Sequence, residues 1–315
     1  MRIVFIGTSE LGIPSLEALS RQAAHEILVI TKPDQRAGRG RRTTSSPLKH
    51  AARTLKLECL EPEDINAPEV LAEVEAFKAN VLVVASYWAK LSNALLELPP
   101  FGGINIHPSL LPRYRGASPV PFALLNGDPV TGVTLFRMGS RMDAGDILGQ
   151  TEIPVASDDN LQTLHDKLAE AAAPLLLRVL TGLEEGTVVP MPQDASRVVL
   201  APKLAKKDGA ISWEKSAVQI DRLVRAFTPW PGAFTFYRCG DASFRLTVTV
   251  CKVLDACRLP TGIVPGQIVE VQKGLVVACA EGLLEITRLK REGKKEMSSI
   301  DFLRGFKVES GAVLG

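Results

Sequence analysis

Short apolar runs recur along the first half of the chain and constrain its fold more than any other feature. The runs are IVFI (3–6), EILVI (26–30), VLVVA (81–85), INIH (104–107) and GVTLF (132–136). Several are apolar at every position, which is typical of strands buried on both faces of a parallel sheet. Segments with helical patterns, such as 13–20 and 67–78, lie between them. This alternation predicts βαβ units and an open parallel sheet in an α/β protein.

The alternation ends in the second half, and 315 residues are long for one domain. Residues 159–181 predict an amphipathic helix that Pro174 kinks or divides. The next stretch has three prolines and no sustained period, so we expect a linker. Short strand candidates at close spacing follow, which is typical of a small β-barrel. The predicted organisation is an α/β domain at 1–186, a linker at 187–207 and a β-barrel domain at 208–315.

Several classes of protein are not indicated. Neither GxGxxG nor GxxxxGK[ST] occurs, so nicotinamide and ATP cofactors have no support. The five cysteines are scattered and form no CxxC pair, so neither a disulfide framework nor a zinc site is indicated. No apolar stretch approaches the ~18 residues of a membrane span. We therefore expect a cytoplasmic protein without a membrane partner, or one in an organelle matrix after removal of a leader.

Positive charge is concentrated in two clusters, although the net charge is only +2. The first cluster contains Lys32, Arg36, Arg39, Arg41 and Arg42 against one acid, Asp34. The second contains Arg288, Lys290, Arg291, Lys294 and Lys295 against Glu292. Taken alone, either cluster is typical of a solvated surface.

The strand at 104–107 carries a polar pair at its carboxyl end. Asn105 and His107 are two residues apart, so both side chains project from the same face. Pro108 stops the strand, and ligands of open α/β sheets bind beyond such strand ends. The pair is therefore a candidate site, with a purely structural histidine as the alternative.

A second candidate is RMDAGDIL, which contains Asp143 and Asp146 and follows the strand at 132–136. A carboxylate near His107 would favour the imidazolium and orient the ring. The alternative is that both aspartates only shape a turn at Gly145. A metal bound by His107 and Asp143 would lack a third ligand, so we expect none. Ser109 is a poor nucleophile candidate, because its side chain diverges from His107 across the proline.

Together, INIHPSLLPRYRGASP and TGVTLFRMGSRMDAGDIL resemble the formyltransferase family that uses 10-formyltetrahydrofolate. The family motif is Asn-x-His on a strand, a Ser-Leu-Leu-Pro loop and a distant Asp. KPDQRAGRGRR, APKLAKKDGAISW, RAFTPWPGAF and GKKEMSSIDFLRG extend the resemblance to members that act on methionyl-tRNA. One departure is Trp88, which stands where the family commonly has glycine and would crowd a wall near the expected folate pocket.

The resemblance implies a Rossmann-like catalytic domain, an OB-like tRNA-binding barrel and formyl transfer to initiator methionyl-tRNA by a monomer. It implies that Asn105 and a protonated His107 donate to the oxyanion and that Asp143 accepts a proton. No metal is required. The implied folate-binding residues are Ser109, Leu110, Leu111 and Pro112, and the implied tRNA-binding residues are Lys32, Arg36, Arg39, Arg41 and Arg42.

Two alternatives remain open. A related formyltransferase could act on a small amine, such as an amino sugar or a ribonucleotide amine. The basic loop at 32–42 and the second domain argue against this. A non-catalytic RNA-binding protein could use the same barrel and basic clusters, but the presence of all three polar residues, Asn105, His107 and Asp143, argues against it.

Overall fold

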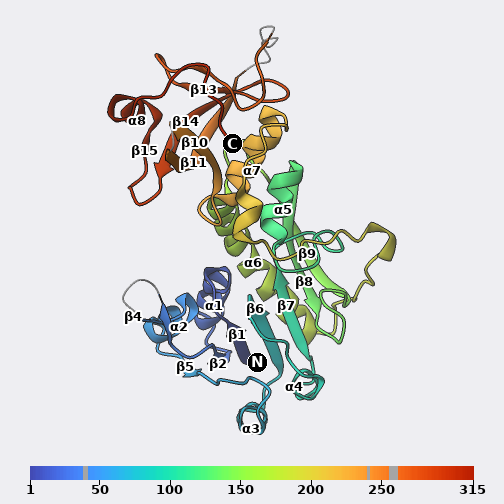
Figure 1. The fold of residues 1–315 in the computed structure, drawn as a ribbon. Helices are drawn as coiled ribbons and strands as arrows, with labels where there is room; N and C mark the ends of the chain where they lie inside the picture. Colours follow the sequence, from blue (N-terminus) through green and yellow to red (C-terminus); the bar gives the residue numbers. More distant parts are fainter. Residues whose placement is uncertain (38–41, 240–241, 255–261) are drawn as a thin grey trace. The chain divides into compact units, whose positions relative to one another are not determined.

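A computed structural model describes the chain except residues 38–41, 240–241 and 255–261 (Figure 1). The chain divides into two compact units, which are described separately. Unit 1 contains Met1–Pro119, Val130–Pro154 and Leu164–Pro202, and unit 2 contains Val120–Pro129, Val155–Thr163 and Lys203–Gly315. The domain limits proposed from the sequence stay predictions. Within the described ranges, no helix is long and apolar enough to cross a membrane.

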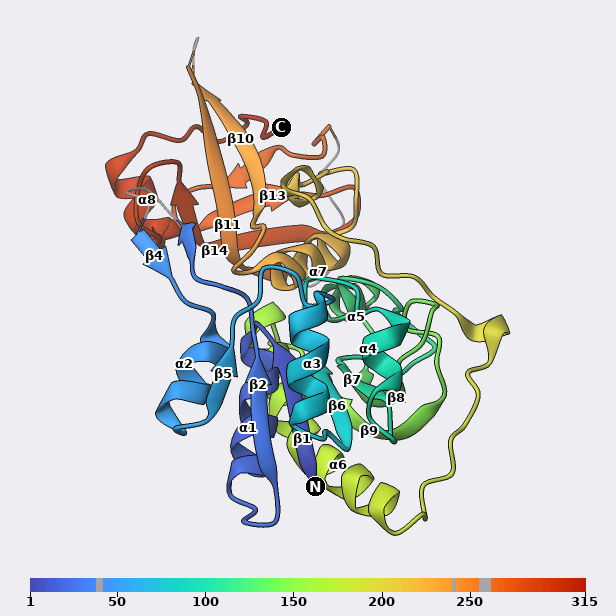
Figure 2. The same cartoon turned by 90° about the horizontal axis from the view of Figure 1, so that it is seen from below.

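Unit 1 is built on a seven-stranded sheet with the order β5-β2-β1-β6-β7-β8-β9 (Figure 2). The strands are β1 (Arg2–Gly7), β2 (Glu26–Ile30), β5 (Glu58–Leu60), β6 (Val81–Ala85), β7 (Gly103–His107), β8 (Val130–Arg137) and β9 (Ile147–Pro154). The first five in the sheet are parallel, and β8 and β9 are antiparallel to their neighbours. The predicted parallel-rich α/β fold is confirmed. Every residue of β6 is buried, as its apolar sequence requires.

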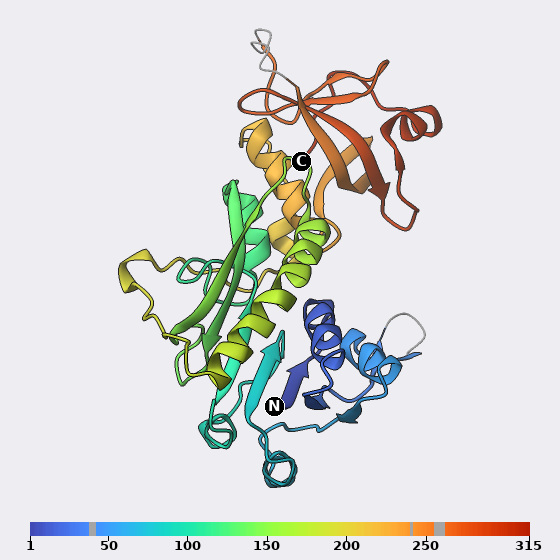
Figure 3. The same ribbon diagram turned by 180° about the vertical axis from the view of Figure 1, so that it is seen from behind.

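Helices cover both faces of this sheet. They are α1 (Ile13–Ser20), α2 (Pro47–Thr54), α3 (Pro68–Ala76), α4 (Asn93–Glu97) and α6 (Leu161–Glu184). A further helix, α5 (Pro119–Asn126), lies mostly in unit 2. Valines and leucines of α3 and α4 share one apolar cluster with alternate residues of β1, β2 and β6. The long helix α6 packs against β9, where the side chains of Leu175 and Val179 approach Gly149 (Figure 3).

Pro174 lies inside α6 without dividing it, so of the two expected effects, a kink or a division, the division is wrong. A proline removes one backbone hydrogen bond from a helix interior and costs about 3 kcal/mol. Buried residues continue on both sides of it, from Leu168 to Leu180. Burial of this apolar stripe offsets the cost of the missing hydrogen bond.

Unit 2 is an antiparallel β structure with a helix beside it, as the predicted second domain required. Its elements are α7 (Ala217–Phe227), β10 (Ala233–Cys239), β11 (Ala242–Leu254), β12 (Ile268–Glu270), β13 (Leu275–Ala278), β14 (Leu283–Arg291), β15 (Met297–Ser298) and α8 (Ser299–Gly305). The sheet order is β10-β11-β14-β13-β12, with β15 also on β14. Ile268 N of edge strand β12 donates to Ala312 O at 2.8 Å, and Gly315 N donates to Phe236 O of β10 at 3.0 Å. The carboxyl terminus thus joins both edges, as in a barrel.

The first basic cluster lies on a short hairpin after β2. Its strands are β3 (Gln35–Ala37) and β4 (Arg42–Thr44), which pair antiparallel. Arg36 and Arg42 belong to these strands, whereas Arg39 and Arg41 lie outside the described residues. Lys32 precedes the hairpin and is half-buried.

A buried lysine anchors the base of this hairpin. The side chain of Lys49, on α2, is 2% exposed, and its Nζ donates to Asp34 Oδ1 at 2.5 Å and to Glu61 Oε2 at 2.6 Å. Asp34 stands immediately before β3 and Glu61 immediately after β5. The two carboxylates outweigh burial and raise the pKa of Lys49, while the Lys49 ammonium lowers the pKa of Asp34. Lys49 therefore ties the start of the hairpin to the edge of the sheet.

We expect Lys49→Met to lower the Tm by several degrees, because it leaves two neighbouring carboxylates without their counter-charge. Arg53→Met is the matched control, since Arg53 lies one turn along α2, is 61% exposed and only approaches Glu61 at 3.9 Å. Its Tm should stay near that of the parent. The contribution of Asp34 should be lost as the pH falls through its lowered pKa, so the two proteins should converge in acid. Equal losses of Tm in both variants would contradict this account.

Candidate active site

Strand β7 presents the predicted polar pair on one face. Ile104 and Ile106 are fully buried on the other face, which fixes the register of the strand. The side chain of His107 is 6% exposed, and Asn105 is half-buried. In the described part of the chain, the side-chain amide of Asn105 has no hydrogen-bond partner. Its donor is therefore available to a ligand.

Asp143 reaches His107 by a route that the sequence did not indicate. β8 is antiparallel to β7, so it ends beside the start of β7 and not beside His107. The chain then turns back, with Asp143 in the left-handed region at φ +48°, and brings Asp143 Oδ2 to 4.0 Å from His107 Nδ1. A side chain on Gly145 would lie 1.7 Å from Arg137 O, so the turn requires glycine. Asp146 is exposed and makes only a backbone contribution, accepting from Arg137 N.

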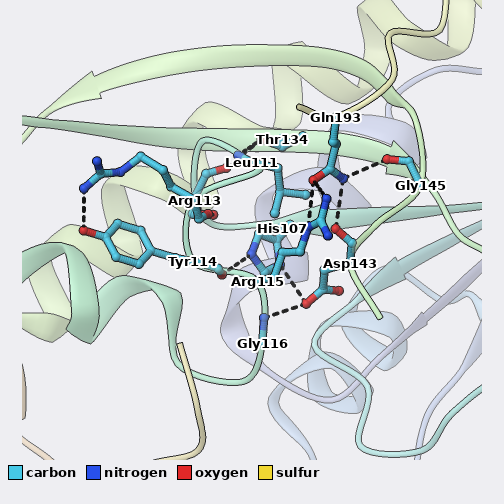
Figure 4. Close-up of polar contacts among 11 residues, drawn as sticks. His107, Leu111, Arg113, Tyr114, Arg115, Gly116, Thr134, Asp143, Gly145 and Gln193 are labelled. Atoms are coloured by element: carbon cyan, nitrogen blue, oxygen red, sulfur yellow. Dashed lines mark hydrogen bonds and ion pairs between the residues drawn. The ribbon is translucent and has the colours of Figure 1, made fainter. Parts of the chain in front are cut away.

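Three consecutive loop residues make hydrogen bonds that hold the site together, and two of them bind the titratable side chains of His107 and Asp143 (Figure 4). Tyr114 O accepts a hydrogen bond from His107 Nε2 at 2.9 Å. Gly116 N donates to Asp143 Oδ2 at 2.8 Å. Between them, the guanidinium of Arg115 donates twice to Gln193 Oε1, at 3.0 and 2.7 Å. The sequence analysis predicted no role for these three residues, which follow the Ser-Leu-Leu-Pro stretch.

Gln193 is the residue that sequence reasoning missed most clearly. Its Nε2 donates to Asp143 O at 2.9 Å and to Gly145 O at 2.8 Å. It lies in the stretch predicted to be a linker, 50 residues from Asp143. No spacing rule relates residues so far apart, so no local signal could have found it.

The surroundings of His107 favour the neutral form of its imidazole. A carbonyl oxygen can only accept, so Nε2 carries the hydrogen that faces Tyr114 O, and in the neutral ring Nδ1 therefore faces Asp143 with its lone pair. Burial lowers the pKa of His107, and the opposing effects of Asp143 and the Tyr114 carbonyl do not cancel it. The expectation of a protonated histidine stays a prediction, and the lowered pKa disfavours the imidazolium in the protein without substrate. Asp143 opposes the effect of burial only in part, because its carboxylate stands 4.0 Å from Nδ1 and already accepts from Gly116 N.

Side chains of β8 and β9 hold the predicted folate loop, Ser109 to Pro112, by hydrogen bonds to its backbone. Thr134 Oγ1 donates to Ser109 O at 2.6 Å and accepts from Leu111 N at 3.0 Å. Gln150 Nε2 donates to Leu111 O at 2.9 Å. Ser109 and Leu111 are buried, whereas Leu110 and Pro112 are half-buried. The hydroxyl of Ser109 donates to Arg113 O at 2.7 Å and is thereby occupied.

Trp88 follows β6, the neighbour of β7, and its side chain is 61% exposed. It lies beside Tyr87, with ring centroids 5.9 Å apart. Burial raises the pKa of the Tyr87 hydroxyl to about 12.

Among the described residues, no group of three or more His, Cys, Asp or Glu side chains could hold a metal ion.

Comparisons with known proteins agree along the whole chain. A family model described as formyl transferase matches residues 1–180, and a second, described as formyl transferase C-terminal domain, matches residues 203–307. Methionyl-tRNA formyltransferase of Acetivibrio thermocellus is 40% identical over 316 aligned residues, which cover 100% of both chains.

Solved structures share the fold at low sequence identity. Methionyl-tRNA formyltransferase from Clostridium thermocellum superposes with a TM-score of 0.55 at 14% identity, covering 81% of this chain and 94% of that chain. An N-formyltransferase from Helicobacter canadensis, in complex with folinic acid and dTDP-3-aminofucose, gives a TM-score of 0.66 at 16% identity, covering 90% and 98%.

Proposed function

The chain belongs to the formyl transferase family, and on that premise we propose that it transfers a formyl group from 10-formyltetrahydrofolate to the free amino group of initiator methionyl-tRNA. The product is N-formylmethionyl-tRNA for translation initiation. The observation that supports this chemistry is the grouping of a free amide donor on Asn105, the lone pair of His107 Nδ1 and the carboxylate of Asp143 around one sheet face.

The first step is attack by the amine. An α-amino group has a pKa of about 7.7–8.0, so a useful fraction is neutral near pH 7. Its nitrogen bonds to the formyl carbon, and the carbonyl oxygen becomes an oxyanion. Asn105 donates its amide hydrogen to that oxygen, and such a donor is worth about two to three powers of ten in turnover.

The second step moves one proton. In this proposal His107 Nδ1, and not the Asp143 carboxylate expected from the resemblance, accepts it from the attacking nitrogen, and Asp143 favours the imidazolium so formed. The protonated Nδ1 then becomes a second, charge-assisted donor to the oxyanion. As the bond between the formyl carbon and the folate nitrogen breaks, the proton passes to that nitrogen. His107 returns to its neutral form, and no covalent enzyme intermediate is needed.

One experiment tests the function directly. The protein is mixed with 10-formyltetrahydrofolate labelled in the formyl group and with charged initiator tRNA, and formyl-methionine is then released from the tRNA and counted. Parallel reactions contain an amino sugar nucleotide or a ribonucleotide amine instead. Label in formyl-methionine supports the proposal. Label only in a small amine, or RNA binding without transfer, would replace it by one of the two alternatives.

We further propose that the basic hairpin, with Lys32, contacts phosphates of the tRNA. Changing Arg36, Arg39, Arg41 and Arg42 together to Ser should raise the KM for charged tRNA and flatten the dependence of log affinity on log salt. Each lost contact is worth about 0.9 in that slope on a duplex, or about 0.7 on a single strand. The KM for folate and the slow reaction with a free small amine are the controls and should not change. An unaltered salt slope would leave the cluster as a solvated surface.

A further inference from the structure

The segment at 187–202, here called the connecting arm, belongs to unit 1 and is joined to the rest of that unit by backbone hydrogen bonds. Near one end, Met191 and Ile147 exchange two bonds of 2.8 and 2.9 Å. Near the other, Arg115 N donates to Val199 O at 2.9 Å, and Ala201 N donates to Arg115 O at 2.8 Å. The arm therefore spans from the start of β9, next to the Asp143 turn, to the loop that holds His107.

Gln193 lies between these two anchors and uses the full hydrogen-bonding capacity of its amide. Oε1 accepts both bonds from Arg115, and Nε2 donates both of its hydrogens to the carbonyl oxygens of Asp143 and Gly145 (Figure 4). The Gln193 amide thus joins two segments of the site. One is the loop whose Tyr114 carbonyl binds His107, and the other is the turn that carries the Asp143 carboxylate. A linker that only connected two domains would not need a glutamine side chain with all four of its hydrogen bonds made within the protein.

We propose that Gln193 is a positioning residue that holds the Asp143 turn against His107, so that the connecting arm is a component of the active site. The catalytic consequence rests on the formyl transfer proposed above. The Gln193 amide is fully used by Arg115 and by the carbonyl groups of Asp143 and Gly145, so we assign it no contact with substrate.

The geometry of the Asp143 turn explains why it needs such support. Asp143 adopts a left-handed backbone conformation, which is unfavourable for a residue other than glycine. Its neighbour Met142 is 78% exposed, so apolar packing does not hold the tip of the turn. The carboxylate is held by Gly116 N, and the backbone of the turn is held by Gln193. Without Gln193, two half-buried carbonyl groups lose their donors, and the turn is free to move relative to His107.

Gln193→Met tests the proposal, because methionine has a similar length but makes none of the four hydrogen bonds. We expect kcat to fall on the order of tenfold to a hundredfold, the usual effect of a small misplacement of a reacting group. The KM for each substrate should change by less than about twofold. Leu200→Ala is the matched control on the same arm, because the Leu200 side chain is 68% exposed and only its backbone takes part in the docking.

Gln193→Glu separates docking of the arm from positioning of the turn. A glutamate still accepts both bonds from Arg115, but it offers no hydrogen to Asp143 O and Gly145 O. We expect it to lose at least as much turnover as Gln193→Met, because its second carboxylate oxygen would face the carbonyl oxygens of Asp143 and Gly145 while its bonds to Arg115 remain. Parental turnover in Gln193→Glu would overturn the proposal.

Two further readouts distinguish a role through Asp143 from a general loosening of the fold. In a double-mutant cycle, Gln193→Met should reduce turnover no further once Asp143→Asn is present, whereas losses of turnover that multiply would overturn the proposal.

NMR titration gives the second readout, because the chain has only four histidines. The charged groups around His107 are Asp143 and, beyond it, Arg115 and Arg141. Gln193→Met should lower the pKa of His107 in the same direction as Asp143→Asn. An unchanged pKa would refute the coupling, and this measurement decides the matter even if formyl transfer is not the reaction.

Discussion

His107→Gln is expected to slow formyl transfer by roughly 100- to 1,000-fold, the range for loss of a general acid–base group. Glutamine can still donate a hydrogen bond to Tyr114 O, so the loop should remain in place. What the variant lacks is the lone pair on Nδ1, which in our proposal carries the proton. Turnover is measured with charged tRNA at saturating folate, and the Tm is measured alongside.

The dependence of kcat/KM on pH sharpens this prediction. Burial lowers the pKa of His107 below its ordinary value, and in the proposed mechanism the neutral ring is the active form. The substrate amine, with a pKa of about 7.7–8.0, gives both proteins one loss of activity in acid, and the parent should lose activity again, in a separate acid limb, as the pH drops through the lowered pKa of His107. His107→Gln should lose this acid limb.

Asn105→Ala is the matched comparison for His107→Gln. It removes an oxyanion donor that does not titrate, so it should cost about 100-fold or more and keep the acid limb. Near-normal turnover in either variant would remove that residue from the catalytic machinery. Loss of the acid limb in Asn105→Ala would contradict the assignment of that limb to His107.

Asp143→Asn is expected to reduce turnover on the order of 100-fold and to move the acid limb to lower pH. The asparagine oxygen can still accept from Gly116 N, so the turn is kept while the charge is lost. That charge raises the pKa of His107 against the effect of burial, so its loss lets the pKa fall further. The imidazolium needed in the second step then forms less readily.

The control for this variant is Asp146→Asn, three residues along the same turn. Asp146 is exposed and contributes to the turn through its backbone carbonyl, so its variant should retain parental turnover and pH profile. A parental profile at near-normal rate in Asp143→Asn would leave Asp143 as a turn residue only. Equal losses in the two variants would indicate damage to the turn and not to the charge.

The candidate site illustrates which features a sequence encodes locally. The alternation in INIH places Asn105 and His107 on one face whatever the rest of the fold does, because side chains of a strand alternate with a period of two. The apolar runs of β1 and β6 likewise require burial on both faces, and so indicated a sheet covered by helices. These properties depend only on neighbouring residues. They were therefore available from the sequence, as was the family resemblance carried by its motifs.

Other features depend on contacts between distant residues, and only the tertiary structure decided them. The apolar run at 132–136 does not reveal its direction, so the return of Asp143 to His107 could not be predicted from it. The neutral state of His107 depends on how completely the fold buries the ring and on how far Asp143 stays from it. Gln193 shares no periodicity with the turn that it holds, because hydrogen bonds across 50 residues follow from packing and not from local pattern. The sequence by itself determined which side chains share a strand face, and the packing of distant segments decided their distances, their charge and what supports them.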